Sequence, residues 1–585
     1  MQSGRPRNGL GLGIMRKIGL IGLALAAPCG LATVSAAQAA DPSVTPDFGA
    51  LASTPSAPKR KAVDCRAPDA PYKDYNCLEA YLGDGFFERL INYYRLEMGH
   101  EGPPADPKAP PSRRAGWQDA PATTPPFPFA EWPYGGSTNL GVTRTGSADS
   151  PLMMALGNTG VGKWMNESGI QVYGWINGGG NLSTNTSHFA GNNPAAYMVN
   201  PNSIQLDQAV VYIERLPDTV QRDHIDWGFR FSTIYGENYR YTNGFGYMSY
   251  QFNGHQLFNG YDFPMVYGEL FIPQIADGLL LRLGRFISLP DIEAQLAPNN
   301  YMYSHSLTYA WDNYTNTGIQ ATMALNKNWF LQFGVTVGTE AAPWHMGQTM
   351  PNPFPNPVFP GNTMLRDPGA KPSFTYGFRW QSDSGWDNIY VIADSTNDGT
   401  WGYNNLQWYG ITWYHRINKE WHFSWETYTL SQRNVLNANN PLVTGPGGIV
   451  ANGGFPFTPA NGIFFNGPNL AACPDPNTLT CTARVFTSLV YLNYQFSPLD
   501  NISFRSEFYN DMEAQRTASA APTRLVEFSV GWQHWLSPQI EIRPEVAYYR
   551  SLDAPAFNAN PFAVPAIPAN KNSAFIAAAD LIWHF

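Results

Sequence analysis

The sequence predicts an all-β protein: a transmembrane antiparallel up-and-down β-barrel of about 16 strands, with a small N-terminal helical and linker extension. Three observations predict this fold. Apolar and polar residues alternate with period two over segments of about 9–12 residues, the length of a tilted strand that spans a bilayer. Short turns alternate with long polar loops along the chain, and the last expected strand ends in an aromatic residue, Phe585.

Composition supports a β-rich chain. Charged residues make up 14% of the 585 residues and aromatic residues another 14%, whereas a typical soluble domain has about 25% charged residues. The mean hydropathy is −0.29, so the aromatic excess does not belong to a generally apolar chain. A hydrophobic content of 43% excludes disorder throughout, and a net charge of −9 argues against a nucleic-acid partner.

Residues 1–39 have the pattern of a secretory signal peptide. The basic Met15-Arg16-Lys17 precedes an apolar run over 18–27, and Ala37-Gln38-Ala39 forms a cleavage site. The apolar run is shorter than the roughly 20 residues that a transmembrane helix needs. Cleavage removes four basic residues and no acidic one, which lowers the net charge from −9 to −13. We therefore expect an exported chain.

Export exposes the remaining cysteines to an oxidising compartment. We expect two disulfides that staple local loops, Cys65–Cys77 and Cys473–Cys481. A metal site is not favoured, because the pairs lack C-x-x-C spacing and lie far apart in the sequence.

Residues 40–135 are predicted to form a Pro-rich periplasmic extension, and 136–585 the barrel. Apolar residues that recur every fourth position predict one amphipathic helix over 78–97. These residues are Leu82, Phe86, Leu90 and Tyr94. The favoured interpretation is a small disulfide-tethered cap packed on the barrel, and the alternative is a periplasmic plug or an oligomer contact.

The strand pattern is clear around 523–535. There Val526, Phe528, Val530 and Trp532 alternate with Glu527, Ser529, Gly531 and Gln533, so one face is apolar and the other polar. The expected strands lie near 168–178, 202–215, 224–235, 263–273, 279–288, 317–325, 329–338, 373–382, 386–395, 404–416, 421–431, 484–496, 501–511, 523–535, 539–550 and 573–585. An even number places both ends of the barrel on the periplasmic side.

The C-terminal strand carries an assembly signal. Its apolar face consists of Ala577, Ala579, Leu581, Trp583 and Phe585. A last strand of this pattern resembles the signal by which bacterial barrels are recognised for outer-membrane insertion. It implies the outer membrane as location, and outer-membrane lipid and the barrel-assembly machinery as partners.

The polar faces of the strands indicate a water-filled lumen. Burying so many charges in a dry β-sandwich would cost several kcal/mol each, whereas a barrel of about 16 strands holds water. The candidate pore-lining residues are Asp226, Arg230, Arg282, Arg379, Glu426, Tyr491, Arg505, Glu507, Tyr509, Glu527, Arg543 and Glu545. Arg285 is an alternative to Arg282. Both signs of charge occur, so the pattern favours a weakly selective channel, with a mild preference for cations because of the negative net charge.

Two questions about the lumen stay open at this stage. The inward Arg and Glu side chains either set a constriction with a transverse field or only solvate the inner wall. The long loops, 432–483 before the others, either fold inward and narrow the pore or decorate the surface of the barrel. Tryptophans near strand ends, Trp175, Trp227 and Trp408 among them, are expected in the interfacial girdles. The alternative is a surface inside the lumen on which sugars stack.

Several segments resemble the OmpL-like family of bacterial β-barrel porins. They are GIQVYGWINGGGNLSTN at 169–185, LDQAVVYIERLPD at 206–218, WGFRFSTIYGENYRY at 227–241, MVYGELFIPQIADGLLLRLGRFISLPDIE at 265–293 and YAWDNYTNTGIQATMALNKNWFLQFGV at 309–335. The resemblance covers most of 168–585, and LRLGRF is its most specific piece. It implies a passive outer-membrane channel for small hydrophilic solutes or ions. A carbohydrate-selective porin and a closed adhesive or structural barrel are the alternatives.

No motif for enzymatic chemistry stands out. The sequence lacks G-x-S-x-G, H-E-x-x-H and P-loop patterns, so we expect no catalytic residue, no cofactor and no metal. The glycine run Gly178-Gly179-Gly180 is interpreted as a turn or a β-bulge. A homo-oligomer is left open.

Overall fold

The computed structural model describes residues 79–98, residue 140 and residues 150–585 with gaps. The gaps are 188–189, 196, 243, 245–246, 249–250, 252–257, 288–291, 340, 346–348, 352–363, 367–371, 399–404, 446–469, 498, 518–520, 538 and 561–566. The expected signal peptide and the Cys65–Cys77 disulfide lie outside the described residues.

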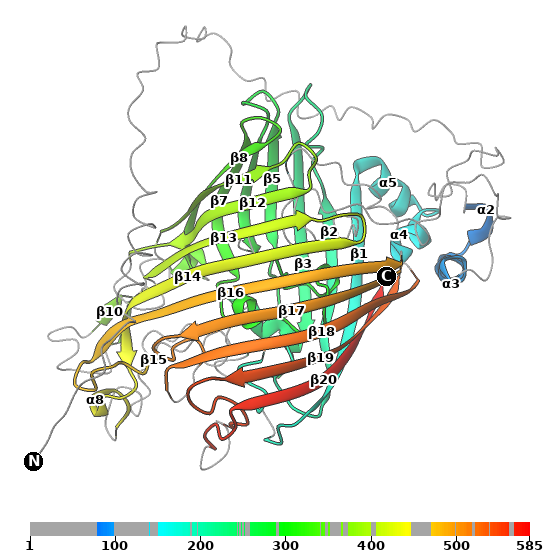
Figure 1. The fold of residues 1–585 in the computed structure, drawn as a ribbon. Helices are drawn as coiled ribbons and strands as arrows, with labels where there is room; N and C mark the ends of the chain where they lie inside the picture. Colours follow the sequence, from blue (N-terminus) through cyan, green and yellow to red (C-terminus); the bar gives the residue numbers. More distant parts are fainter. Residues whose placement is uncertain are drawn as a thin grey trace, which may run out of the picture. The chain divides into compact units, whose positions relative to one another are not determined.

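Sixteen antiparallel strands form a closed barrel (Figure 1). The first eight are β1 (Ile170–Ser183), β2 (Ile204–Arg215), β3 (Asp226–Gly236), β5 (Val266–Ile272), β6 (Leu279–Ile287), β7 (Thr315–Ala324), β8 (Trp329–Thr339) and β11 (Ser373–Gln381). The others are β12 (Asp387–Thr396), β13 (Leu406–Arg416), β14 (Trp421–Asn437), β16 (Thr480–Ser497), β17 (Asp500–Asp511), β18 (Thr523–Ser537), β19 (Ile540–Ser551) and β20 (Ser573–His584). Pairing of β1 with β20 closes the barrel, with Gly178 opposite Leu581. The predicted fold class and number of strands are confirmed.

Alternation of side chains sets the two faces of the wall. Along β18, Glu527 and Ser529 are buried inside, whereas Phe528 and Val530 are exposed on the outside. A closed sheet pairs every backbone N–H and C=O, which a spanning segment needs because lipid offers no hydrogen-bond partner. The barrel therefore presents an apolar exterior and a polar interior.

The main differences from the predicted strands occur at the loop ends of β14 and β16. Strand β14 ends six residues later than predicted and β16 begins four residues earlier, because Val435 pairs with Cys481 and Leu436 with Thr480. The short strand β15 (Leu470–Ala471) adds to β14 in parallel. Two other short strands, β9 (Thr349–Pro351) and β10 (Met364–Arg366), form a separate hairpin, and β4 (Gly260–Asp262) extends the wall at β3.

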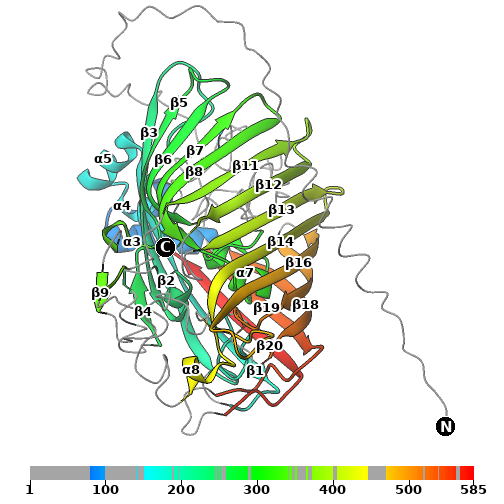
Figure 2. The same cartoon turned by 90° about the vertical axis from the view of Figure 1, so that its left-hand side faces the viewer.

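The connections differ between the two ends of the barrel. Short turns join β5 to β6, β7 to β8 and β13 to β14, and long loops join the strands at the other end. The long loops contain η3 (Glu237–Tyr241), η4 (Ala297–Asn299), α7 (Leu307–Ala310), η5 (Pro343–His345) and α8 (Pro441–Thr444). In Figure 2, α7 lies between the walls of the barrel. The interior is therefore partly filled by loops.

The described part of the N-terminal extension is helical, but the prediction of a single helix over 78–97 is wrong in detail. It divides into α2 (Glu79–Leu82) and α3 (Phe86–Glu97), because Gly83 adopts a left-handed backbone with φ of 85°. Two further helices, α4 (Pro151–Leu156) and α5 (Gly160–Ser168), lead into β1. In the described part of the chain, no helix has the length and apolar character to cross a membrane.

Candidate pore constriction

One long loop crosses the inside of the barrel. Its described part, residues 292–314, connects β6 to β7 and carries η4 and α7. It contacts the distant strands β14, β16, β17 and β19 through hydrogen bonds. Among the described residues, this loop rather than the expected 432–483 reaches the opposite wall.

Three carboxylates of the wall hold the loop by its backbone. Glu507 accepts hydrogen bonds from the N–H groups of Leu307 at 2.7 Å and Thr308 at 2.9 Å. Glu545 accepts from the N–H of Ser304 at 2.9 Å. Hydrogen bonds to an ionised acceptor are about twice as strong as neutral ones, so the carboxylates fix the loop to the wall.

Glu426 completes this set from β14. Its Oε2 accepts a hydrogen bond from the N–H of Ile292 at 2.9 Å. The contact lies at the start of the described loop, whereas those of Glu507 and Glu545 lie near α7. The loop is therefore held at both ends of its path.

Two arginines hold the loop by its carbonyl oxygens. Arg543 donates to the carbonyls of Ala297 at 2.7 Å and Asn300 at 3.0 Å. It also pairs with Asp580 on β20, which accepts from it at 2.5 Å and 3.1 Å. Because Asp580 compensates the buried guanidinium, Arg543 stays in position without a carboxylate from the loop.

Arg505 connects the wall to an acidic residue of the loop. It donates to the carbonyl of Ser304 at 2.9 Å and to the hydroxyl of the same residue at 2.7 Å. Its guanidinium lies 3.1 Å from Glu527 on β18 and 3.2 Å from Glu293 of the loop. The Tyr491 hydroxyl donates a further hydrogen bond to Glu293. This cluster is the most highly charged contact between loop and wall.

Strands β2, β3, β5 and β6 carry ion pairs on their inner face. Arg230 pairs with Glu214 at 2.6 Å, and Arg282 with Glu269 at 2.8 Å. These pairs join neighbouring strands, so they contribute to the charge of the inner wall.

Arg285 also points inward, where it pairs with Asp262 at 2.8 Å. Residues 282 and 285 would face opposite sides in a regular strand. The intervening Gly284 has φ of 139°, and this irregular backbone lets both arginines point inward.

Aromatic side chains of three loops pack together inside the barrel. The ring of Tyr197 stacks on His305 at 3.6 Å and on Tyr241 at 4.2 Å between centroids. His305 Nε2 lies 2.7 Å from the carbonyl of Ala294, where it donates a hydrogen bond. Burial lowers the pKa of His305 to about 4, so the imidazole is neutral at neutral pH.

A glycine of the predicted run makes room for the loop. A Cβ atom on Gly179 would lie 2.3 Å from the ring of Tyr303, which is far inside van der Waals contact. The register of β1 shifts between Asn177 and Gly178, as in a β-bulge. The predicted bulge is confirmed, and the glycine run allows close approach of the loop.

The structure places all twelve predicted pore-lining residues in the buried interior of the wall. Six of them contact the inward loop directly: Glu426, Tyr491, Arg505, Glu507, Arg543 and Glu545. Glu527 supports Arg505, and Arg230 and Arg282 lie in the ion pairs of the nearer wall. Tyr509 is buried on the same wall as Glu507. Their role in selecting solutes stays a prediction.

The remaining two residues, Asp226 and Arg379, make no described hydrogen bond to the inward loop. Asp226 accepts from the N–H of Asp218 at 2.7 Å and pairs with Arg215 at 2.9 Å, so it stabilises the β2–β3 turn. Arg379 lies 3.7 Å from the ring centroid of Phe330. Two tryptophans expected in the girdle, Trp175 and Trp408, are buried inside the barrel instead, because they share the phase of inward residues.

Sequence reasoning missed the partners in the loop: Glu293, Ser304 and His305. The loop sequence contains a usable signal. Residues 292–314 hold four tyrosines and one tryptophan but no Lys or Arg, and large aromatic side chains favour burial. Asp580 was also missed, although its position in β20 places it on the inner face.

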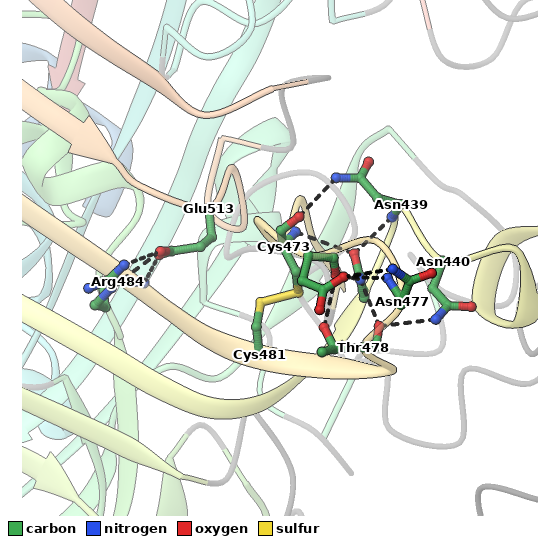
Figure 3. The surroundings of a disulfide bond; sticks show 10 residues. Asn439, Asn440, Cys473, Asn477, Thr478, Cys481, Arg484 and Glu513 are labelled. Atoms are coloured by element: carbon green, nitrogen blue, oxygen red, sulfur yellow. Dashed lines mark hydrogen bonds and ion pairs between the residues drawn. A yellow bond between two sulfur atoms is a disulfide. The ribbon is translucent and has the colours of Figure 1, made fainter. Parts of the chain in front are cut away.

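A disulfide organises the loop end of β14 and β16 (Figure 3). Cys473 and Cys481 are joined with an S–S distance of 2.07 Å. Asn439 donates to the carbonyl of Cys473 at 3.2 Å, and nearby Arg484 pairs with Glu513 at 2.5 Å. The cluster lies at the rim and does not contact residues 292–314 in any described hydrogen bond.

The described residues contain no group of three or more His, Cys, Asp or Glu side chains placed to hold a metal ion. Residues 169–585 match the family described as "Putative beta-barrel porin-2, OmpL-like". No curated protein matches the chain.

Solved structures with a similar arrangement include bacterial channels. The outer membrane channel DcaP of Acinetobacter baumannii has 6% identity and a TM-score of 0.41, over 71% of this chain and 97% of that one. An anion-selective porin from Comamonas acidovorans has 9% identity and a TM-score of 0.41, over 71% and 99%. OmpT of Vibrio cholerae has 7% identity and a TM-score of 0.37, over 71% and 97%. These identities are too low to transfer a property to this chain.

Proposed function

Because the chain belongs to the OmpL-like family of β-barrel porins, we propose that it forms a passive outer-membrane channel for small hydrophilic solutes, narrowed by the inward loop 292–314. The observation that carries the proposal is the attachment of this loop to the wall by Glu426, Glu507 and Glu545. A loop held at several points gives a lumen of defined width. Solutes would then be selected by size and charge rather than by binding to a catalytic site.

The charge around the loop favours cations. Carboxyl groups outnumber guanidinium groups among the wall residues that hold the loop. They are Glu426, Glu507 and Glu545 against Arg505 and Arg543. Together with the net charge of the exported chain, this supports a mild cation preference.

The signal-peptide pattern at the N-terminus and the last strand of the barrel support export and outer-membrane assembly. We propose that residues 1–39 are removed as a signal peptide and that residues 40–135 stay in the periplasm. The C-terminal strand β20 presents Leu581 and Trp583 on the outer face, which supports its recognition by the barrel-assembly machinery. A passive channel needs no enzymatic activity, and no described contact favours one.

The experiment is planar-bilayer conductance of the refolded chain with a salt gradient across the membrane. Stepwise openings with a reversal potential on the cation side would support the proposal. Block of the current by an oligosaccharide at low concentration would favour the carbohydrate-selective alternative. Absence of openings from protein that is folded and inserted would refute an open pore and favour a closed adhesive barrel.

A further inference from the structure

Helix α3 carries an apolar stripe that protein does not cover in the described structure. Phe87 is 74% exposed and Ile91 is 56% exposed. With Tyr94 and Met98 they recur at spacings of three and four residues, which places them along one side of the helix. Large apolar side chains in water cost free energy in proportion to their area, so a continuous exposed stripe marks a surface that binds a partner.

The other side of α3 is attached to the rest of the extension. Tyr93 and Leu96 are buried in a cluster with Leu82, against which Met154 of α4 packs. Arg89 donates to the carbonyl of Met154 at 2.9 Å and 3.0 Å. The orientation of the helix is therefore fixed, and the stripe is directed away from α4.

The stripe continues into the outer surface of the barrel. The ring of Tyr94 lies 6.1 Å from that of Trp583, and its hydroxyl donates to the carbonyl of His584 at 2.6 Å. Trp583 is one of the exposed residues on the outer face of β20. On the inner side of the rim, Gln539 donates to the hydroxyl of Tyr93 at 3.3 Å. Helix α3 thus straddles the edge of the wall, with Tyr94 on the outside.

Helix α5, beside β1 and β2, also carries exposed apolar side chains next to an outward-facing tryptophan. Val161 is 60% exposed and Trp164 is 58% exposed, at a spacing of three residues. Arg215 donates to the carbonyl of Ser168 at 3.2 Å, and its guanidinium lies 4.6 Å from the ring of Trp227. Trp227 is exposed on the outer face of β3. Two separate helices are therefore joined to outward tryptophans.

We propose that α3 and α5 lie in the headgroup region of the membrane leaflet at the short-turn end, with Phe87, Ile91, Val161 and Trp164 inserted among the lipids. The partner is phospholipid rather than protein, because the stripe continues the lipid-facing surface of the barrel at Trp583. Tryptophan and tyrosine favour this interfacial region. The exposed Arg95 and Lys163 flank the two stripes, where their cationic ends can reach lipid phosphates.

The test places an environment-sensitive fluorophore on the full-length protein in phosphatidylethanolamine and phosphatidylglycerol vesicles. It is attached to Ile91→Cys on the stripe of α3 and to Asn166→Cys, an exposed residue of α5 about half a turn round that helix from Trp164. Phe528→Cys on the lipid-facing wall reports insertion of the barrel. The wild-type chain, labelled in the same way, gives the background from its own cysteines.

We expect spin-labelled lipid to quench the probe at Ile91→Cys several-fold more than at Asn166→Cys, and iodide to show the opposite order. The proposal rests on insertion of the barrel but not on its conductance. Quenching at Phe528→Cys without quenching at Ile91→Cys would therefore overturn it alone. If iodide reaches Ile91→Cys, the stripe faces water. If neither quencher reaches it, a second copy or another segment covers it. Either result contradicts the lipid contact.

Discussion

Glu507 of β17 accepts a hydrogen bond from the backbone N–H of Leu307 at 2.7 Å, across 200 residues of sequence. Its second oxygen accepts from Thr308 at 2.9 Å. One buried carboxylate therefore satisfies two N–H groups at the first turn of α7. Backbone groups inside a protein need such partners, so this residue determines where the loop can rest.

Replacing this anchor is expected to widen the channel. Glu507→Ala removes the acceptor of both N–H groups, and a hydrogen bond to a charged group contributes about 1.5–3 kcal/mol. The loop should leave the wall for part of the time. Single-channel recording should then show a larger conductance and more current noise than the wild type.

The matched control is Arg524→Ala. Arg524 pairs with Asp553 at 2.7 Å at the exposed loop end of the barrel, where water and salt screen the interaction. Its conductance should equal that of the wild type. An unchanged conductance in Glu507→Ala would show that this anchor does not hold the loop.

Arg505→Ala is expected to destabilise the barrel as well as the loop. It leaves Glu527 and Glu293 buried without their common cation, and loss of one partner from a buried pair costs about 3–5 kcal/mol. The reversal potential should move further to the cation side, because the wall loses one positive charge. The temperature at which the folded band disappears on a denaturing gel measures the stability of the barrel. The reversal potential in a salt gradient measures the ion selectivity.

The double variant Arg505→Ala with Glu527→Gln separates the two effects. Removing the carboxylate should recover part of the lost stability and return the reversal potential toward that of the wild type. If the double variant is as unstable as Arg505→Ala, the lost stability comes from packing around Arg505 and not from an uncompensated buried charge.

The sequence predicts which residues line the inside of the barrel wall much better than it predicts the loop residues that contact them. Glu507 and Glu527 were assigned to the inner face because strand phase repeats every two residues. Leu307 and Ser304 lie in a loop that has no period, so nothing local predicts that they meet β17 and β19. Their position depends on long-range contacts that form only in the closed barrel.

Local irregularity limits even the strand assignments. Arg282 and Arg285 appeared to be alternatives on opposite faces, but Gly284 breaks the regular backbone between them and both point inward. Trp175 was assigned to the girdle by residue type. Its phase with Tyr173, which is also buried inside, is the better guide, because phase fixes the direction of a side chain and residue type does not.

The Cys473–Cys481 disulfide is expected to stabilise the rim without affecting conduction. It closes a short loop with a sequence separation of 8, for which chain entropy predicts a contribution of about 2–3 kcal/mol. In the variant Cys473→Ser with Cys481→Ser, limited proteolysis should cut faster near 470–481. The conductance should stay that of the wild type, and a changed conductance would link this rim to the inward loop.

Acid is expected to loosen the inward loop through His305. Burial lowers its pKa from 6.5 to about 4 when the loop is docked, whereas a loop released into water returns it toward 6.5. The released state therefore binds the proton more readily, and docking loses stability as the pH falls from 6.5 to 4. With about 1.4 kcal/mol for each pKa unit, the loss is on the order of 3 kcal/mol.

Burial is the largest influence on the pKa of His305 and outweighs the neighbouring groups. Glu293 and the hydrogen bond to the Ala294 carbonyl favour the imidazolium, whereas Arg543 and Arg505 disfavour it. The stacked ring of Tyr197 offers no acceptor to a second N–H. Channel conductance should therefore rise as the pH falls below about 6, the side on which a released His305 becomes protonated.

His305→Phe separates this histidine from the carboxylates that titrate in the same range. Phenylalanine keeps an aromatic ring against Tyr197 but binds no proton, so most of the rise in conductance between pH 6.5 and 4 should disappear. A pH dependence of equal size in wild type and variant would assign the effect to the acidic residues of the wall.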